Sequence, residues 1–176
     1  MVLHRLCGVA SSAICYSCRV HGVEGEQVTE VLFYHLERQP LERVLPTLLE
    51  RTLERGWRAV VQCASEERLE AIDGWLWTYR EDSFLPHGTI RDGPPALQPI
   101  FLTTGEENPN GANVRFLVEG AVISDFKPYD RVVLIFNGHD AAAIELARAE
   151  WKRARAMGCE VTYWQQADNG RWERRA

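Results

Sequence analysis

The segment Asp130-Arg-Val-Val-Leu-Ile-Phe136 indicates the fold class of this chain. From Val132 to Phe136 every residue is apolar. A strand with one face in water alternates between apolar and polar residues, whereas a strand that is apolar throughout is buried on both faces. Such strands are typical of parallel sheets that helices cover on both sides. We therefore expect residues 130–136 to form a central strand of a parallel sheet.

The segments on either side alternate between strand and helix patterns. Three segments have apolar residues at helical spacing and helix-ending residues at their boundaries, namely 41–55, 65–77 and 140–157. Six further segments have the composition of strands, namely 28–36, 58–63, 84–87, 98–103, 112–119 and 160–165. The order β-α-β-α-β-β-β-β-α-β predicts an α/β fold with three layers, in which helices flank a largely parallel sheet.

The turn after the first expected strand lacks the composition of a nucleotide-binding loop. It reads His35-Leu-Glu-Arg-Gln-Pro40, without a glycine, and the chain contains no GxxxxGK[ST] motif. Glycines are needed in such loops because the backbone must approach the pyrophosphate closely. We therefore expect a Rossmann-like fold without the glycine loop. A nucleotide-dependent enzyme with an atypical phosphate site is the alternative that the α/β order leaves open.

Composition places limits on the class of protein. The chain has 176 residues, 45% of them apolar, and a formal net charge of −5. These values predict one domain with a sizeable core. They argue against a protein that binds DNA through the overall charge of the chain. No apolar run approaches the roughly 20 residues that a membrane span needs. The five cysteines are an odd number without a secreted pattern, so we expect reduced thiols in a cytoplasmic protein.

Residues 1–27 differ from the rest because they show no clear hydrophobic period. Three interpretations are a signal peptide, an unstructured leader and a translation start assigned too early. We favour the third, since Val28 opens a strand-like segment and a valine codon can serve as an alternative start. The expected organisation is therefore a leader over residues 1–27 and a single α/β domain over residues 28–176, with a short polar C-terminal tail.

Residues that could carry chemistry are not arranged as a catalytic or metal site. The five histidines lack the spacing of metal ligands, and the Cys15–Cys18 pair has no second pair to complete a zinc site. Cys63 ends an expected strand and is read as a buried thiol, and His87 as a hydrogen-bonded ring in a tight turn. We expect no catalytic residues, cofactor or metal, which favours a binding protein.

The last expected helix carries a candidate binding surface. Four residues at i, i+3, i+4 and i+7 share one of its faces, namely Arg148, Trp151, Lys152 and Arg155. Leu146 and Met157 lie on the opposite face, which we expect to pack on the sheet. A solvated face that complements the helix C-terminus would explain the cations alone. An exposed tryptophan more often marks a recognition site, so we predict binding of an acidic peptide with an apolar end and a free carboxylate.

The segment Trp75–Gly88 is dense in aromatic residues and, with other segments, resembles a known family. The matching pieces are Val31-Leu-Phe-Tyr-His-Leu36, Leu76-Trp77, Ser83-Phe-Leu-Pro-His87, Pro99-Ile100, Leu146-Ala-Arg148 and Trp151-Lys152. On these residues the chain resembles the chi subunit of bacterial DNA polymerase III, over about residues 28–166. The resemblance implies a small α/β fold without nucleotide chemistry, in an accessory subunit of the clamp-loader assembly that has no catalytic activity of its own.

The resemblance also implies partners. The family binds the acidic C-terminal tail of single-stranded DNA-binding protein, pairs with the psi subunit where one exists, and so meets DNA indirectly. By position, Arg148 matches the basic residue that contacts the tail, and Trp151 matches its aromatic neighbour. The surface used for psi is matched by Trp77, Phe84 and Pro86.

Two positions depart from the family pattern. Ile144 stands where the family has a second lysine, for which Lys152 or Arg155 is a candidate substitute. Asn137 replaces an apolar residue of the family's tail pocket, so we expect a different pocket edge. The Arg171–Arg175 segment has no family counterpart, although its charge could add to the tail site.

Overall fold

The computed structural model of the chain describes residues 28–167 and 169–176. The expected leader and the Cys15–Cys18 pair lie outside these residues. Strands and helices follow one another in this order: β1 (Glu30–Leu36), α1 (Leu41–Glu54), β2 (Ala59–Gln62), α2 (Glu66–Thr78), β3 (His87–Gly88), β4 (Ile100–Thr103), β5 (Val114–Val118), β6 (Arg131–Asn137), α3 (Ala141–Ala156), β7 (Glu160–Gln166) and β8 (Trp172–Arg174). Two 3₁₀ turns, Ile90–Asp92 and Pro95–Leu97, lie between β3 and β4.

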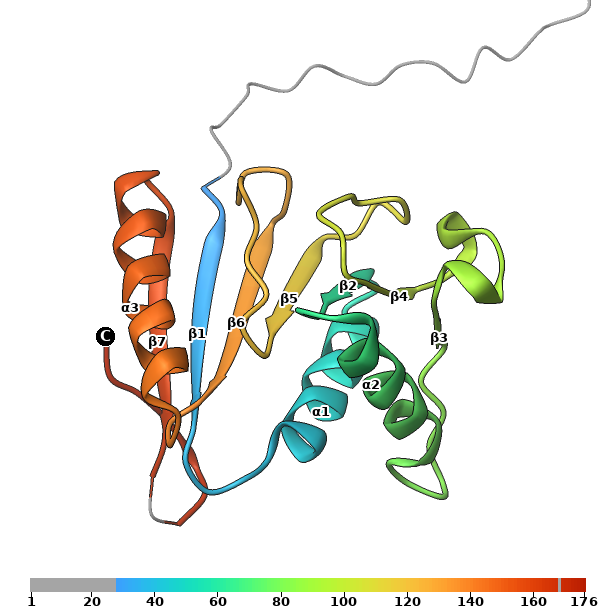
Figure 1. The fold of residues 1–176 in the computed structure, drawn as a ribbon, viewed down its shortest axis with the longest axis horizontal. Coiled ribbons are helices and arrows are strands. Elements are labelled where there is room, and N and C mark those ends of the chain that lie inside the picture. Colours follow the sequence, from blue (N-terminus) through green and yellow to red (C-terminus); the bar gives the residue numbers. More distant parts are fainter. Residues whose placement is uncertain (1–27, 168) are drawn as a thin grey trace, which may run out of the picture.

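The strands form a single eight-stranded sheet in the order β3-β4-β2-β5-β6-β1-β7-β8. All neighbouring pairs are parallel except β7 and β8, which are antiparallel. Figure 1 shows α3 beside β1 and β7, and α1 with α2 beside the β5–β2–β4 half of the sheet. The predicted α/β fold with a largely parallel sheet is therefore confirmed.

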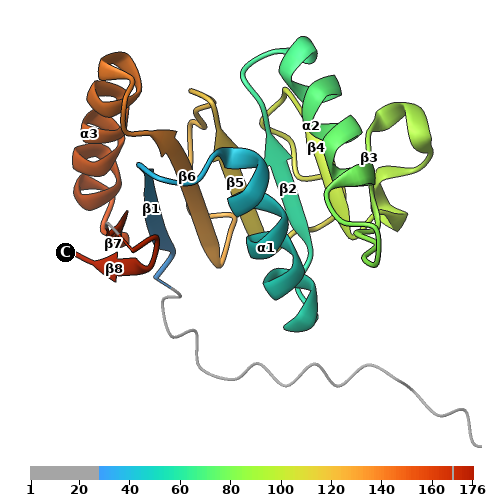
Figure 2. The same cartoon turned by 90° about the horizontal axis from the view of Figure 1, so that it is seen from below.

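The central strand β6 supplies side chains to both faces of the sheet. Val133 and Ile135 belong to the core that contains the apolar residues of α1 and α2. Val132, Leu134 and Phe136 belong to the second core, against which α3 packs. Because successive side chains of a strand point to opposite faces, two cores require an uninterrupted apolar strand between them. This is the physical reason for the sequence pattern, and it produces the three layers seen from below in Figure 2.

Two strands differ from the sequence expectation. The strand predicted over residues 84–87 is wrong in its bounds, because β3 comprises only His87 and Gly88. Pro86 has no backbone N–H, so it cannot donate to a strand ladder, and Phe84 is exposed. At the other end, the tail forms β8, where Trp172 packs edge-on against Tyr34 with 4.8 Å between ring centroids.

A buried cation joins the middle of the sheet to the loop after β4. The side chain of Arg115 in β5 is fully buried. Its Nε donates to Tyr129 Oη at 2.7 Å, and one terminal nitrogen donates to Gln62 Oε1 at 2.5 Å and Gly105 O at 3.1 Å. The other terminal nitrogen donates to the carbonyl oxygens of residues 106 and 107 at 3.0 Å and 2.5 Å. All five acceptors are neutral, so the guanidinium is held by hydrogen bonds and not by a direct ion pair.

Replacing Arg115 with methionine should destabilise the fold severely. The change keeps an unbranched apolar stem but removes the guanidinium and leaves several buried oxygens without a donor, at a cost of about 1–3 kcal/mol for each such group. We expect the free energy of unfolding to fall by at least about 3 kcal/mol in urea titrations with an unchanged m-value. Arg68→Met, which removes an exposed ion pair with Glu119, is the control and should cost about 1 kcal/mol or less. Equal losses in the two variants would contradict the role of Arg115.

Candidate functional site

Helix α3 presents three exposed cations along one side. Asp140 begins the helix by accepting hydrogen bonds from the amides of Ala142, at 2.9 Å, and Ala143, at 3.4 Å. Ala147 and Ala154 are buried against the sheet. The exposed side carries Arg148, Lys152 and Arg155. The structure therefore brings the three predicted cations to one accessible surface.

Trp151 does not stand exposed at the centre of this stripe, so that expectation was wrong. Its ring lies edge-on to Phe33 at 5.2 Å and to Tyr163 at 6.1 Å, measured between centroids, and it packs with the α3 core. The small side chains of Ala147 and Ala154 let the helix approach the sheet, and the indole fills the space beside them. Trp151 thus forms the half-buried boundary between the packed side of α3 and its cationic side.

The three exposed cations differ in their partners. Arg148 forms an ion pair with Glu145 one turn earlier, at 2.5 Å. Within residues 28–167 and 169–176, Lys152 and Arg155 make no ion pair. An exposed pair such as Arg148–Glu145 contributes only about 0–1 kcal/mol, since water solvates both charges well. A ligand carboxylate can therefore take the place of Glu145.

A fourth cation of the helix, Arg153, has a structural role that sequence reasoning missed. Its guanidinium donates to the backbone oxygens of Ile123, at 2.5 Å, and Ser124, at 3.0 Å, and lies 4.3 Å from the centroid of the Phe126 ring. It also pairs with Glu150, which is buried. Arg153 does not share the helix face of Arg148, Lys152 and Arg155. This difference in helical position was the sequence feature from which a partner within the fold could have been predicted.

A cleft of about 750 Å³ opens at the carboxyl ends of β1 and β6, next to the first turns of α3. The crossover from β1 runs to one side of the sheet and that from β6 to the other, and such points are where open α/β sheets bind ligands. Its walls include residues 36–42, Asn137 and Leu146. Asn137, which the sequence analysis expected to alter a pocket edge, thus lines this cleft.

The loop between β1 and α1 already has its amides occupied. The side-chain oxygen Oε1 of Gln166, a buried residue at the end of β7, accepts hydrogen bonds from the backbone N–H groups of Glu37, Arg38 and Gln39 at 3.2, 2.9 and 3.0 Å. Consecutive amides of this kind form a nest that binds anions in phosphate-binding folds. Because Gln166 fills the nest, this loop is not available to a phosphate. This arrangement speaks against the nucleotide-enzyme alternative.

A histidine lies beneath the cleft wall. His35 is mostly buried, and its Nδ1 is 2.6 Å from the hydroxyl of Tyr163. Its ring stacks on Phe136 at 5.0 Å between centroids. A Cβ on Gly138 would lie 2.0 Å from His35 Nε2, so only glycine fits there. Burial lowers the pKa of His35 below its ordinary value, while Glu37 opposes this effect.

The second candidate surface is the exposed aromatic pair at the end of α2. Trp77 and Phe84 are 56% and 68% exposed, and their ring centroids are 5.9 Å apart. The buried ring of His87 packs against Trp77, with 4.7 Å between the ring centroids. The Nδ1 atom of His87 lies 2.7 Å from the carbonyl oxygen of Leu85. His87 is therefore a structural residue of the turn that also contains Pro86, as the sequence analysis expected.

The structure also bears on thiol chemistry, metal binding and membrane insertion. Burial raises the pKa of the Cys63 thiol to about 12, which makes this cysteine a poor nucleophile. Among the described residues, no group of three or more His, Cys, Asp or Glu side chains is placed to hold a metal ion. In the same part of the chain, no helix is long and apolar enough to cross a membrane.

Comparison with known proteins gives consistent matches. The family described as "DNA polymerase III chi subunit, HolC" matches residues 28–162. The "Probable DNA polymerase III subunit chi" of Rickettsia prowazekii (strain Madrid E) is 27% identical over 104 residues, which are 59% of this chain and 63% of the relative. The "DNA polymerase III subunit chi" of Escherichia coli (strain K12) is 23% identical over 103 residues, or 58% of this chain and 70% of the relative.

A third relative matches over a shorter segment. The "DNA polymerase III subunit chi" of Pseudomonas aeruginosa (strain PAO1) is 32% identical over 59 residues, which are 34% of this chain and 40% of the relative. The chain thus spans less than two thirds of the length of two of these curated relatives.

Stability should decrease as His35 becomes protonated. The pKa of His35 is lower in the folded chain than the roughly 6.5 of an unfolded histidine. The unfolded state therefore binds the proton first as the pH falls. The contribution of His35 to the free energy of unfolding is complete above about pH 6.5 and is lost between that value and the lower folded pKa.

We expect His35→Gln to show a smaller loss of unfolding free energy between pH 7.5 and pH 5 than the unchanged chain, measured by urea titration at each pH. Thr47→Val, at an exposed position of α1 without a titratable group, is the control and should keep the original pH dependence. An identical pH dependence in His35→Gln and the unchanged chain would contradict the assignment.

Proposed function

The chain belongs to the DNA polymerase III chi subunit family, and we propose that it links the clamp loader to single-stranded DNA-binding protein. In this proposal the chain binds the acidic C-terminal tail of that protein during DNA replication in the cytoplasm. It meets DNA only through this partner, and it contributes binding and no catalysis to the polymerase assembly. The observation that carries the proposal is the surface of α3, where three exposed cations share one side of a helix whose first turns line a cleft.

The chemistry of this surface suits an acidic tail with an apolar end. Arg148, Lys152 and Arg155 offer charge-assisted hydrogen bonds to carboxylates, and arginine can bind a carboxylate through two parallel N–H donors. The cleft at the first turns of the same helix has apolar walls at Leu146 and Ala143 that can receive an apolar side chain. Trp151 supports this surface from its packed side, because its ring holds α3 against β1 and β7.

A second contact of the proposed assembly is the aromatic pair at the end of α2. Trp77 and Phe84 expose large apolar rings that the domain does not cover. Exposed aromatic rings held in place by a rigid turn are typical of protein–protein contacts. We assign this surface, together with Pro86, to a psi-like subunit of the clamp loader.

Arg148→Ala should weaken binding of the tail. Loss of a charge-assisted hydrogen bond costs about 1.5–3 kcal/mol, so we expect the Kd of a short acidic peptide ending in Pro-Phe to rise about tenfold or more, measured by fluorescence anisotropy. Arg51→Ala, an exposed change of the same charge on α1, is the control and should leave the Kd unchanged. An unaltered Kd in Arg148→Ala would reject the assigned site.

Trp77→Ala and Phe84→Ala should affect assembly more than stability. Both side chains are largely exposed, so their removal leaves most of the core intact, whereas hot-spot aromatics cost about 2 kcal/mol or more at an interface. We expect tagged variants of the chain to recover less clamp-loader protein from extracts of the source cell than the unchanged chain does. Recovery of single-stranded DNA-binding protein through its tail should persist in both variants. Undiminished clamp-loader recovery would contradict this assignment.

A further inference from the structure

Strand β8 and Arg175 after it belong to the segment whose charge, by the sequence analysis, could add to the tail site. Glu173 in β8 pairs with Gln165 in β7, and the backbone N–H of Arg175 donates to the carbonyl oxygen of Tyr163 at 2.9 Å. Residues two apart in a strand, and residues opposite each other in a ladder, share a face of the sheet. The tail of the chain therefore carries Glu173 and Arg175 on the same face as Tyr163.

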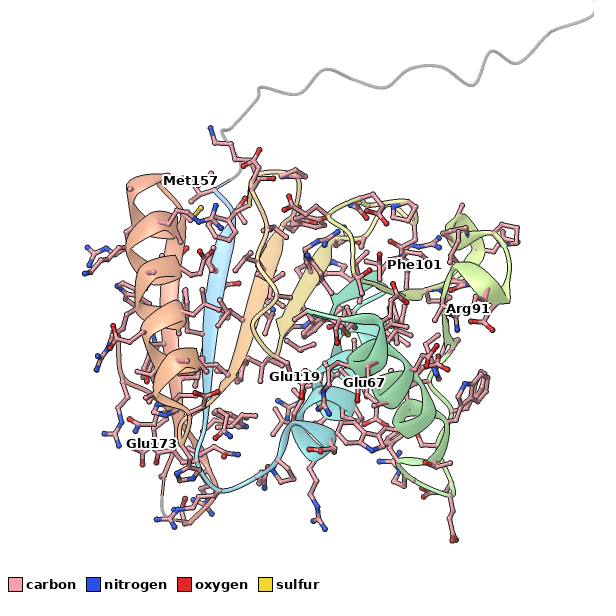
Figure 3. All side chains as sticks on the ribbon, in the orientation of Figure 1. Glu67, Arg91, Phe101, Glu119, Met157 and Glu173 are labelled. Carbon is pink, nitrogen blue, oxygen red and sulfur yellow. The ribbon has the colours of Figure 1, made fainter. Side chains whose placement is uncertain are left out.

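Tyr163 connects this face to α3. Its ring lies 6.1 Å from that of Trp151, edge to face. Arg148 is exposed and lies three residues before Trp151 on α3, so the two residues are neighbours on the helix surface. Figure 3 shows Glu173 at this edge of the molecule, near the half of α3 that is farther from Met157. Tyr163 thus links the two arginines: Arg175 bonds its backbone, and Trp151, the helix neighbour of Arg148, packs on its ring.

Each of the two arginines forms an ion pair with a glutamate that is two or three residues earlier in the chain. Arg148 pairs with Glu145 at 2.5 Å, with side chains 67% and 71% exposed. Arg175 pairs with Glu173 at 2.9 Å, with side chains 53% and 47% exposed. In each pair the glutamate occupies the guanidinium that a carboxylate of a ligand would bind. Neither pair is shielded from water, so each is weak and open to exchange.

We propose that Glu145 and Glu173 act as internal competitors of the acidic tail, and that Arg175, which follows β8, is a second tail-binding cation in addition to Arg148. This inference rests on the proposed function, because it assumes that the tail binds next to Arg148. A ligand with one carboxylate gains little, since it only replaces one ion pair by another. A ligand with several carboxylates and an apolar end replaces both pairs and adds contacts with the cleft. The competitors thereby select multiply acidic peptides against singly charged ones.

Removing either competitor should tighten binding. The probe is the synthetic peptide Asp-Asp-Asp-Ala-Pro-Phe with a free C-terminal carboxylate, and the readout is its Kd by fluorescence anisotropy at constant low salt. We expect Glu145→Gln and Glu173→Gln each to lower the Kd about two- to fivefold, which is the range for an exposed ion pair. Arg175→Ala should raise the Kd. Glu54→Gln changes the net charge equally at an exposed position of α1 and should leave the Kd unchanged.

A double-mutant cycle makes the test specific. In an Arg148→Ala background, Glu145→Gln should give no gain, because the guanidinium for which it competes is absent. Gains of equal size in Glu145→Gln, Glu173→Gln and Glu54→Gln would reduce the effect to bulk charge and overturn the inference. If Arg148→Ala weakens binding while neither glutamine variant tightens it, the inference fails and the proposed function stands. If Arg148→Ala leaves the Kd unchanged, the proposed function itself fails, and the inference fails with it.

Discussion

The guanidinium of Arg115 is buried in the middle of the sheet without a carboxylate partner, and the loops around it have their shape because it must be solvated. Its five donors are used by Gln62, Tyr129 and the backbone of residues 105–107. A buried charge is tolerated only when hydrogen bonds replace the lost water. The loop after β4 therefore turns its carbonyl groups inward, and Tyr129 is held between β5 and β6. With these segments in place, β5 can carry Arg115 within the sheet and pair with β6 along its whole length.

Helix α3 shows how one element serves the core and the surface together. Its alanines pack on the sheet, Trp151 fills the space at their edge, and Arg153 binds the backbone of residues 123 and 124. These contacts fix the rotation of the helix, so that Arg148, Lys152 and Arg155 face water as a group. A binding surface gains affinity when its side chains lose little conformational entropy on binding. The contacts of the alanines, Trp151 and Arg153 hold the helix in place and so reduce this loss.

The cleft at the ends of β1 and β6 illustrates how this architecture can be separated from nucleotide chemistry. The crossovers leave an opening at the place where related architectures bind phosphates. Gln166, however, takes the three amides that a phosphate would need. The same hydrogen bonds hold residues 37–39 as a wall of the cleft. The opening is thus kept in shape by the chain itself, and in our proposal it receives the apolar end of the partner's tail.

The sequence by itself determined the layers and the order of elements, because the apolar run of β6 and the helical spacing of α1, α2 and α3 are local patterns with one structural solution. It also located the cations of α3, which lie within one helix, and the aromatic residues Trp77 and Phe84, which are close to each other in the chain. It did not determine that Trp151 is half-buried, since the helical positions of the stripe do not tell how closely alanines let a helix approach a sheet. The pairing of β8 with β7, the partners of Arg115 and the three amides on Gln166 join residues far apart in the chain. Such contacts depend on how the crossovers bring strands together, so only the tertiary structure decided them.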